Sequence, residues 1–242
     1  GKGDDALAEY GRILQDHPKY ANGWYGRANL RHAKGDFAGA ISDWTAYLEL
    51  SPKDPEGWYS LGRSRRAVKL YDAAIQDYMR AIELKPDYAL AYLGRGLARL
   101  DKKELAAAES DFTKALELDP RCATAWYSRG VVKQDAERKD YDGAIADYTK
   151  AVECDPRYAS AYYNRGLARQ EKRDFKGAAA DLTIVIELDP ASADAYYSRA
   201  RAKWGLENLE GAVADYKKSL EIAPKNWEYR KHAESAIKKL GG

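Results

Sequence analysis

Few residues of this 242-residue chain have the types and spacing that catalysis needs. Its three histidines, His17, His32 and His232, lie far apart in the sequence and belong to no recognisable motif. A Ser/His/Asp or Cys/His set must converge to act on a substrate, and no such set is indicated here. The sequence also lacks a P-loop and a Gly-x-Gly-x-x-Gly motif after a strand. We therefore expect no catalytic residues and no enzyme activity.

The cysteines do not indicate a metal site. Cys122 and Cys154 are 32 residues apart, with no Cys-x-x-Cys pair and no histidine cluster beside them. Structural zinc needs four such ligands at short spacings, so we expect no metal and no cofactor. Two separate thiols at helix ends are the favoured interpretation, and a single disulfide is the alternative.

Bulk charge and hydropathy exclude two further classes. The chain has 40 Lys and Arg against 38 Asp and Glu, a formal net charge of +2. That balance argues against a nucleic-acid or membrane-surface binder driven by overall charge. No apolar run reaches the roughly 18 residues of a membrane span.

Prolines recur at a nearly constant interval and define an internal repeat. Proline cannot continue a helix and disfavours helix at the preceding residue, so each one indicates a helix end. Seven of the eight prolines have spacings of 34, 34, 34, 36, 34 and 34: Pro18, Pro52, Pro86, Pro120, Pro156, Pro190 and Pro224. Counting from the third residue after each proline predicts six repeats, at 21–54, 55–88, 89–122, 123–158, 159–192 and 193–226. The fourth has two extra residues near 136–138, in the turn between its helices, where an insertion costs little.

Large and small apolar residues keep the same register in every repeat. The fourth position is aromatic: Trp24, Trp58, Tyr92, Trp126, Tyr162 and Tyr196. The eighth is Gly or Ala, and the twentieth is always Ala. The twenty-fourth is large: Trp44, Tyr78, Phe112, Tyr148, Leu182 and Tyr216. At helical periodicity these positions form one face on each of two helices, which can approach closely where a small residue meets a large one. In the turn between them, Asp36 and Asp174 are expected to cap the second helix.

This pattern resembles the tetratricopeptide repeat family, whose motif is W-x2-L-G-x2-Y, A-x3-F and P over 34 residues. The second repeat carries Trp58, Leu61, Gly62, Ala74, Tyr78 and Pro86 in these slots. The resemblance covers almost the whole chain. It implies an all-α fold, a right-handed solenoid of helix-turn-helix hairpins in which the first helix of each pair lines a concave groove. Residues 1–20 fit only a second helix, so we expect a longer protein or a covering chain there, and 227–242 fit a C-terminal capping helix.

Charged residues depart from the family pattern in a regular way. Position 7 is Arg in five repeats: Arg27, Arg95, Arg129, Arg165 and Arg199. Position 11 is always basic, and position 23 on the second helix is always Asp: Asp43, Asp77, Asp111, Asp147, Asp181 and Asp215. The favoured interpretation is structural, an ion pair that fixes each hairpin. The alternative is a basic stripe for nucleic acid.

The resemblance places positions 2, 5, 9 and 12 of each first helix in the groove. Tyrosine occupies position 5 in five repeats, whereas the third repeat has leucine at all four positions. The candidate partner-binding residues are Tyr25, Tyr59, Arg63, Arg66, Leu90, Leu93, Leu97, Leu100, Tyr127, Val131, Tyr163, Leu167, Tyr197, Arg201 and Trp204. Exposed apolar patches mark interaction sites, although these leucines could instead pack against neighbouring helices. The two-carboxylate clamp of chaperone-tail-binding members is absent, because Tyr25, Ser60, Leu90 and Gly94 fill its slots.

Taken together, the sequence predicts a non-enzymatic scaffold that binds a peptide or helix of a partner protein in the groove. Leu90, Leu93 and Leu100 would anchor it, and Arg63 and Arg66 would favour an acidic flank. No nucleic acid and no membrane are expected as partners. The alternatives are a self-assembling scaffold, associating through the N-terminal end, and a regulatory segment of a larger protein.

Overall fold

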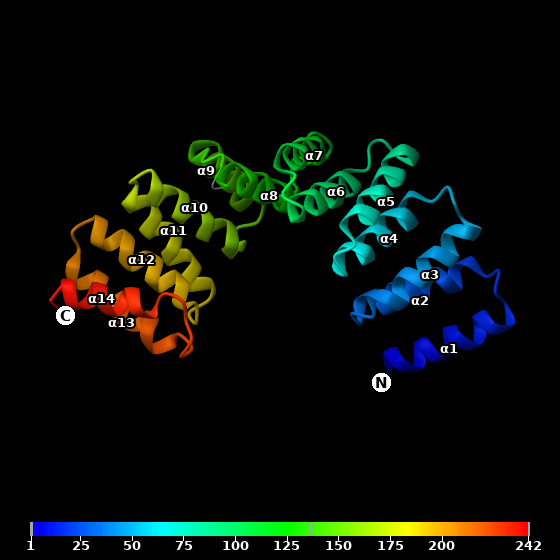
Figure 1. Ribbon diagram of the computed structural model, residues 1–242, viewed down its shortest axis with the longest axis horizontal. Helices are drawn as coiled ribbons and strands as arrows, with labels where there is room; N and C mark the ends of the chain where they lie inside the picture. The colour runs from blue at the N-terminus through cyan, green and yellow to red at the C-terminus, as the bar shows by residue number, and fades with distance from the viewer. Residues whose placement is uncertain (1, 136, 242) are drawn as a thin grey trace. The chain divides into compact units, whose positions relative to one another are not determined.

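The computed structural model describes residues 2–135 and 137–241 of the chain. Within them it has fourteen α-helices and no strand (Figure 1), which confirms the all-α prediction. The chain forms two compact units, Gly1–Pro120 and Arg121–Gly242, each of which is a stack of antiparallel helix hairpins. The two-residue insertion predicted near 136–138 includes residue 136, which lies outside the described residues.

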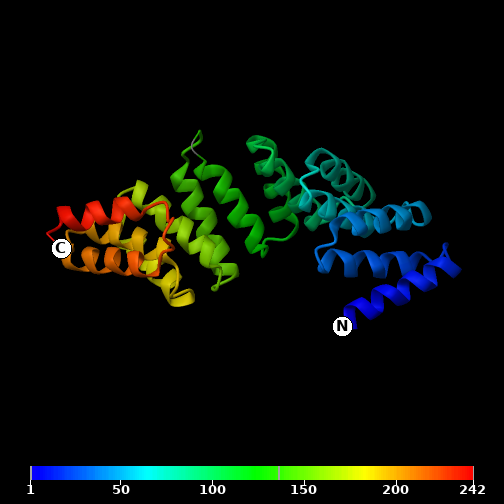
Figure 2. The same ribbon diagram turned by 60° about the horizontal axis from the view of Figure 1, so that its bottom comes forward.

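The first unit contains α1 to α7. Helix α1 packs on α2, and three hairpins follow, in which α3 also packs on α4 and α5 on α6 (Figure 2). The helices are α1 (Lys2–Asp16), α2 (Ala21–Ala33), α3 (Phe37–Leu50), α4 (Pro55–Ala67), α5 (Tyr71–Leu84), α6 (Ala89–Asp101) and α7 (Leu105–Leu118).

The second unit contains α8 to α14, again three hairpins, followed by a helix that packs on the last of them. The helices are α8 (Ala123–Gln134), α9 (Tyr141–Cys154), α10 (Ala159–Glu171), α11 (Phe175–Leu188), α12 (Ala193–Gly205), α13 (Leu209–Ile222) and α14 (Arg230–Lys239). The first helix of each hairpin begins at the residue where the sequence places the start of a repeat. Helix α14 begins three residues later than the predicted Trp227, because Trp227 and Tyr229 pack their rings against Tyr197 before the helix starts.

Side-chain caps mark the start of four second helices, α3, α9, α11 and α13. The side chains of Asp36 and Asp174 each accept a hydrogen bond from a backbone N–H three residues later, at 2.9 Å. Asp140 and Asn208 do the same at 3.0 Å. These bonds satisfy N–H groups that the first turn of a helix leaves without partners. The predicted capping role of Asp36 and Asp174 is therefore confirmed.

The core of each hairpin is the large position-24 side chain against the small position-8 residue. Tyr148 is fully buried, and a Cβ built on Gly130 would lie 2.6 Å from its ring. Tyr78 is approached from two sides, by Gly62 within its own hairpin and by Gly94 of α6. The glycines are thus required by the close approach of helices and not by backbone conformation.

Alanine should therefore have opposite effects on stability at a closely packed helical glycine, Gly94, and at an open one, Gly11. In Gly94→Ala the new methyl group would lie 2.6 Å from the Tyr78 ring, and such overpacking costs about 1–3 kcal/mol. In Gly11→Ala no atom outside the helix's own backbone lies within 4 Å, so the variant should gain about 0.5–1 kcal/mol from helix propensity. Urea unfolding followed by circular dichroism measures both. Equal effects on stability would contradict this packing.

Candidate functional site

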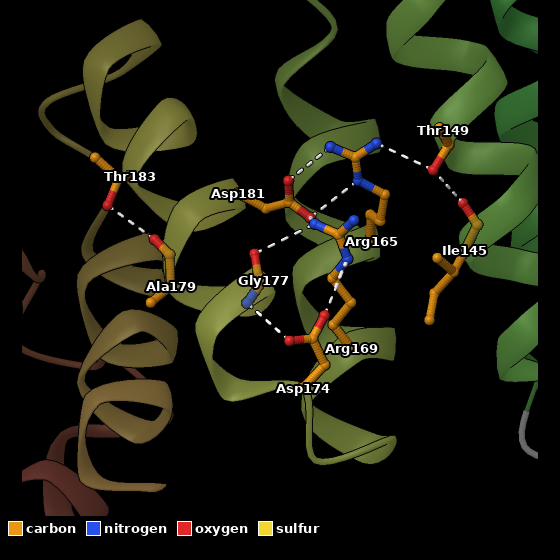
Figure 3. Close-up of polar contacts among 9 residues, drawn as sticks. All are labelled: Ile145, Thr149, Arg165, Arg169, Asp174, Gly177, Ala179, Asp181 and Thr183. Carbon is orange, nitrogen blue, oxygen red and sulfur yellow. Dashed lines mark hydrogen bonds and ion pairs between the residues drawn. The ribbon is translucent and has the colours of Figure 1, made fainter. Parts of the chain in front are cut away.

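Buried aspartates hold the hairpins together, as Figure 3 shows for α10 and α11. Arg165 donates from Nε and Nη2 to the two carboxylate oxygens of Asp181, at 2.9 and 2.7 Å. Arg169, one turn further on, donates from Nη1 to Asp181 Oδ2 at 2.7 Å. We call this arrangement of one aspartate with two cations the aspartate lock. It recurs at Asp43, Asp111, Asp147 and Asp215.

The lock also engages an aromatic ring and the preceding hairpin. The guanidinium carbon of Arg165 lies 5.3 Å from the centroid of the Tyr162 ring, a cation–π distance. The remaining nitrogen of Arg165, Nη1, donates to Thr149 of α9 at 3.1 Å (Figure 3). Most of the basic residues at positions 7 and 11 are therefore used inside the fold. The predicted ion pairs within the hairpins are therefore confirmed.

The second hairpin of the first unit departs from this pattern. Leu61 stands at position 7 and cannot form an ion pair, so Asp77 keeps one cation, Arg65, at 2.6 Å from Oδ1. Asp77 is 2% exposed, and its Oδ2 has no hydrogen-bond partner. Burial raises the pKa of this carboxyl to about 7 against the opposing charge of Arg65. The predicted ion pair is therefore present at this hairpin, but with one cation in place of the two that the other aspartates have.

The predicted tyrosines of the first unit pack inward. The ring centroid of Tyr25 lies 5.0 Å from that of Trp44, and Tyr59 lies between Tyr78 and Tyr88. Such edge-on and tilted pairs stabilise the hairpins and leave these rings half-buried.

The predicted arginines of the first unit are engaged within it. Arg66 forms an ion pair with Asp101 at 2.7 Å, and Arg63 lies over the Tyr59 ring and contacts His32 Nε2 at 3.4 Å. Arg66 therefore offers an acidic partner less charge than its sequence position indicates.

The leucines of α6 do not share one environment. Leu90 is 45% exposed, Leu97 and Leu100 are half-buried, and Leu93 is buried with 9% exposed. Leu93 cannot act as an exposed anchor, because its position in the helix faces the packed side. Of the expected row of four exposed leucines, only Leu90 is exposed.

In the second unit the predicted residues line three cavities. Tyr127 and Tyr163, with Asp189 and Asp194, border a cavity of about 360 Å³, which we call the tyrosine cavity. Leu167 and Arg201 border a second, of about 300 Å³, together with Gln134, Gln170 and Glu171. We call this the α10 cavity. Val131, the remaining predicted residue of this unit, is half-buried and belongs to none of the three.

The third and largest cavity has a volume of about 650 Å³ and lies between α12 and α14; we call it the cap cavity. Three predicted residues of α12, Tyr197, Arg201 and Trp204, form one wall. Arg201 belongs to both the α10 cavity and the cap cavity, so these two meet at its side chain.

Hydrogen bonds between first helices hold these walls in place. Asn164 of α10 donates to the Tyr127 hydroxyl of α8 at 3.2 Å. Gln170 donates to the backbone carbonyl of Ser198 in α12 at 2.7 Å, and the Tyr163 hydroxyl lies 3.3 Å from Ser198 Oγ. The cavities are therefore bordered by side chains whose positions are set within the unit.

An aromatic cluster packs against Tyr197, one of the residues that line the cap cavity. Tyr197 stacks on Tyr229 with ring centroids 4.9 Å apart, and Trp227 donates from Nε1 to Asp194 at 2.7 Å. Burial raises the pKa of Tyr216 to about 12 and also raises that of Tyr197, while the nearby Arg201 charge opposes both shifts. The guanidinium of Arg201 thus lies close to two tyrosine side chains.

Sequence reasoning missed half of the cap cavity. Its other wall is built by Arg173 and Phe175 after α10, Glu207 and Leu209 after α12, and His232 and Lys239 of α14. The turn residues and the capping helix carry no position in the repeat pattern that marks them as binding residues. No signal in the repeat could have found them, because the cavity forms where the last hairpin meets the capping helix.

Within the described residues, no group of three or more His, Cys, Asp or Glu could hold a metal ion. None of the helices in the same residues is long and apolar enough to cross a membrane. Both cysteines are thiols, which agrees with the favoured sequence interpretation.

Solved structures share this fold. YrrB, described as a tetratricopeptide repeat protein with an unusual peptide-binding site, matches with a TM-score of 0.68 and 24% identity over 79% of this chain and 97% of its own. MamA matches with a TM-score of 0.61 and 28% identity over 69% of this chain and 96% of its own. A tetratricopeptide repeat protein from Parabacteroides merdae matches with a TM-score of 0.68 and 18% identity, over 100% of this chain and 93% of its own.

Family models cover most of the sequence, although no curated protein matches it. A tetratricopeptide repeat model matches residues 1–55 and 163–226, and a second of that description matches 89–122. A TPR repeat model matches 70–103 and 133–173. These matches agree with the 34-residue period, the hairpin stack and the glycine-to-aromatic packing described above. The chain therefore belongs to the tetratricopeptide repeat family.

Proposed function

We propose that the chain is a non-enzymatic protein-binding scaffold whose second unit holds an extended peptide segment along α8, α10 and α12. The observation that carries this proposal is the lining of the three cavities. The groove positions 2, 5, 9 and 12 of these helices supply Tyr127, Tyr163, Leu167, Tyr197, Arg201 and Trp204 to them.

The chemistry of this surface suits a peptide. Tyrosine and tryptophan offer large contact areas at low entropy cost, and polar groups between them can bond to a peptide backbone. Gln134, Ser160 and Asn164 lie among the aromatic side chains in the same cavities. A surface of this kind, partly exposed and only partly apolar, favours moderate affinity.

Family membership and similarity in fold also support a peptide-binding function. Members of this family commonly bind proteins through the first helices of their hairpins, and YrrB, similar in fold, is described as having a peptide-binding site. The second unit is preferred to the first because Leu93 is buried and Arg66 is paired with Asp101.

Obstructing the groove tests the proposal. The full protein is immobilised and panned against a phage-displayed library of random octapeptides, and enriched peptides are synthesised and titrated by fluorescence anisotropy. Ser160 is exposed and borders the tyrosine cavity, so Ser160→Trp should fill it and weaken binding about tenfold or more. Ser42 is exposed on the second helix α3, and Ser42→Trp should leave affinity unchanged.

Two results would count against the proposal. The first is a panning that enriches no peptide above the bare support. The second is equal binding by the wild type and Ser160→Trp, with circular dichroism showing both folded.

A further inference from the structure

The cap cavity differs from the rest of the second unit in its charge. Three cations border it from three different segments: Arg173 after α10, Arg201 in α12 and Lys239 in α14. His232 adds a fourth basic side chain, and Glu207 is the one carboxylate among the described residues that line it. Positive charge is thus gathered at one end of the unit, although the whole chain has a net charge of only +2.

These cations form no ion pair within the described residues, in contrast to other cations of α12. Arg199 and Lys203 of α12 both lie 2.8 Å from Asp215, in the last aspartate lock. Arg201 lies between them in sequence but on the cavity side, and no described carboxylate lies within ion-pair distance of it. The same holds for Arg173 and Lys239. A charged side chain that is held near aromatic rings and lacks a counter-ion favours an anionic ligand.

Apolar side chains stand beside these charges. Trp204 is 38% exposed and Leu209 is 45% exposed at the cavity. The Phe175 ring lies against Gly205, where a Cβ would come within 2.6 Å of it, and Arg173 lies 5.9 Å from the centroid of that ring. The cavity can therefore take a large apolar side chain and a carboxylate next to each other.

The tyrosine cavity has the opposite charge, because Asp189 and Asp194 border it. The α10 cavity has both signs, with Lys139 and Arg201 beside Glu171. A uniformly anionic polymer such as single-stranded RNA would be attracted at the cap cavity and repelled at the tyrosine cavity. A peptide avoids this conflict, because its charge can differ from one end to the other.

We propose that the cap cavity recognises the acidic end of a charge-asymmetric peptide, in which Asp or Glu lies beside an aromatic or large aliphatic residue. This inference rests on the proposed function and specifies its ligand. The carboxylate binds Arg201 with Arg173 or Lys239, and the apolar side chain packs on Trp204 and Phe175. The other end of the peptide, which lies towards Asp189 and Asp194, is neutral or basic.

The octapeptides enriched by the panning described above provide the test. Their sequences should carry Asp or Glu next to an aromatic or aliphatic residue at one end, with Lys or Arg absent from that end. Arg201→Gln should weaken the binding of such a peptide about tenfold in low salt. Arg157 is exposed in a turn of the same unit, outside the three cavities, so Arg157→Gln changes the net charge equally and should leave affinity unchanged.

The outcomes separate this inference from the proposed function. Enriched peptides that lack carboxylates, or that bind Arg201→Gln and wild type equally, would overturn the inference and leave peptide binding standing. Tighter binding of an octauridylate than of any enriched peptide, lost in Arg201→Gln, would assign the cavity to RNA and also overturn it. Failure of every peptide to bind would contradict both the proposed function and this inference.

Discussion

Replacing Asp111 by asparagine should destabilise the first unit by about 3 kcal/mol, because it strands two partly buried cations. Asp111 accepts hydrogen bonds from Arg95 at 2.6 Å and from Arg99 at 2.9 Å, and its side chain is almost completely buried. Asparagine keeps one acceptor oxygen but carries no charge. Thermal unfolding by circular dichroism should show a fall in Tm of roughly 10 °C.

An exposed aspartate in the same unit provides the control. Asp87 lies in the turn before α6, has an exposed side chain and forms no ion pair within the described residues. Asp87→Asn makes the same change of charge and should alter stability by less than about 0.5 kcal/mol. Similar melting temperatures for the two variants would show that the aspartate lock contributes nothing measurable.

Asp77→Asn should stabilise the protein, whereas Asp111→Asn destabilises it, and the size of this stabilisation should depend on pH. Unfolded Asp77 ionises near its ordinary pKa of 3.8, whereas the folded carboxyl has a pKa of about 7 because it is buried with one cation and an oxygen without a partner. Between these values the folded protein holds a proton that the unfolded chain has lost. The stability that Asp77 contributes therefore falls as pH rises through this window and is lost above about 7.

Asparagine does not titrate, so the variant escapes this loss. Near pH 4 the variant and the wild type should have similar free energies of unfolding. At pH 8 the free energy of unfolding of the variant should be larger by about 2–4 kcal/mol, so the variant is the more stable protein. Urea unfolding at a series of pH values measures the difference directly. Arg65 of α4 and the Tyr78 hydroxyl are the groups that act on Asp77. Burial raises the pKa of Tyr78 above its ordinary value, so this hydroxyl stays neutral in this range.

A second variant shows whether the missing arginine is the cause. Leu61→Arg restores the residue that position 7 has in the other hairpins, and a second guanidinium beside Asp77 should bring its pKa down. The variant loses the packing of Leu61 against Trp44 and Leu48, so its stability at low pH should fall. The pH dependence between 4 and 8 should disappear. A pH profile unchanged from wild type would mean that desolvation, and not the missing partner, sets this pKa.

Local chemistry and periodicity in the sequence determined the hairpins. Prolines at a constant interval end the second helices, and aspartates such as Asp174 cap the helices that follow the turns. The spacing of Arg165, Arg169 and Asp181 also predicted their contact, because residues at fixed positions of two antiparallel helices must meet when the hairpin closes. The sequence also explains why Asp77 has one cation where the other aspartates have two, because position 7 of its repeat is Leu61.

Tertiary structure decided which predicted groove residues are available to a partner. Leu93 and Leu90 both occupy predicted groove positions of the third repeat, yet Leu93 is buried and Leu90 is exposed. Arg66 and Arg201 are both basic groove residues, but Arg66 has a carboxylate from the next first helix within 2.7 Å. The cap cavity joins two turns, α12 and α14, which the repeat pattern does not relate. Periodicity predicts contacts that recur in every hairpin, whereas exposure and charge compensation depend on the neighbouring helix, which differs at each place.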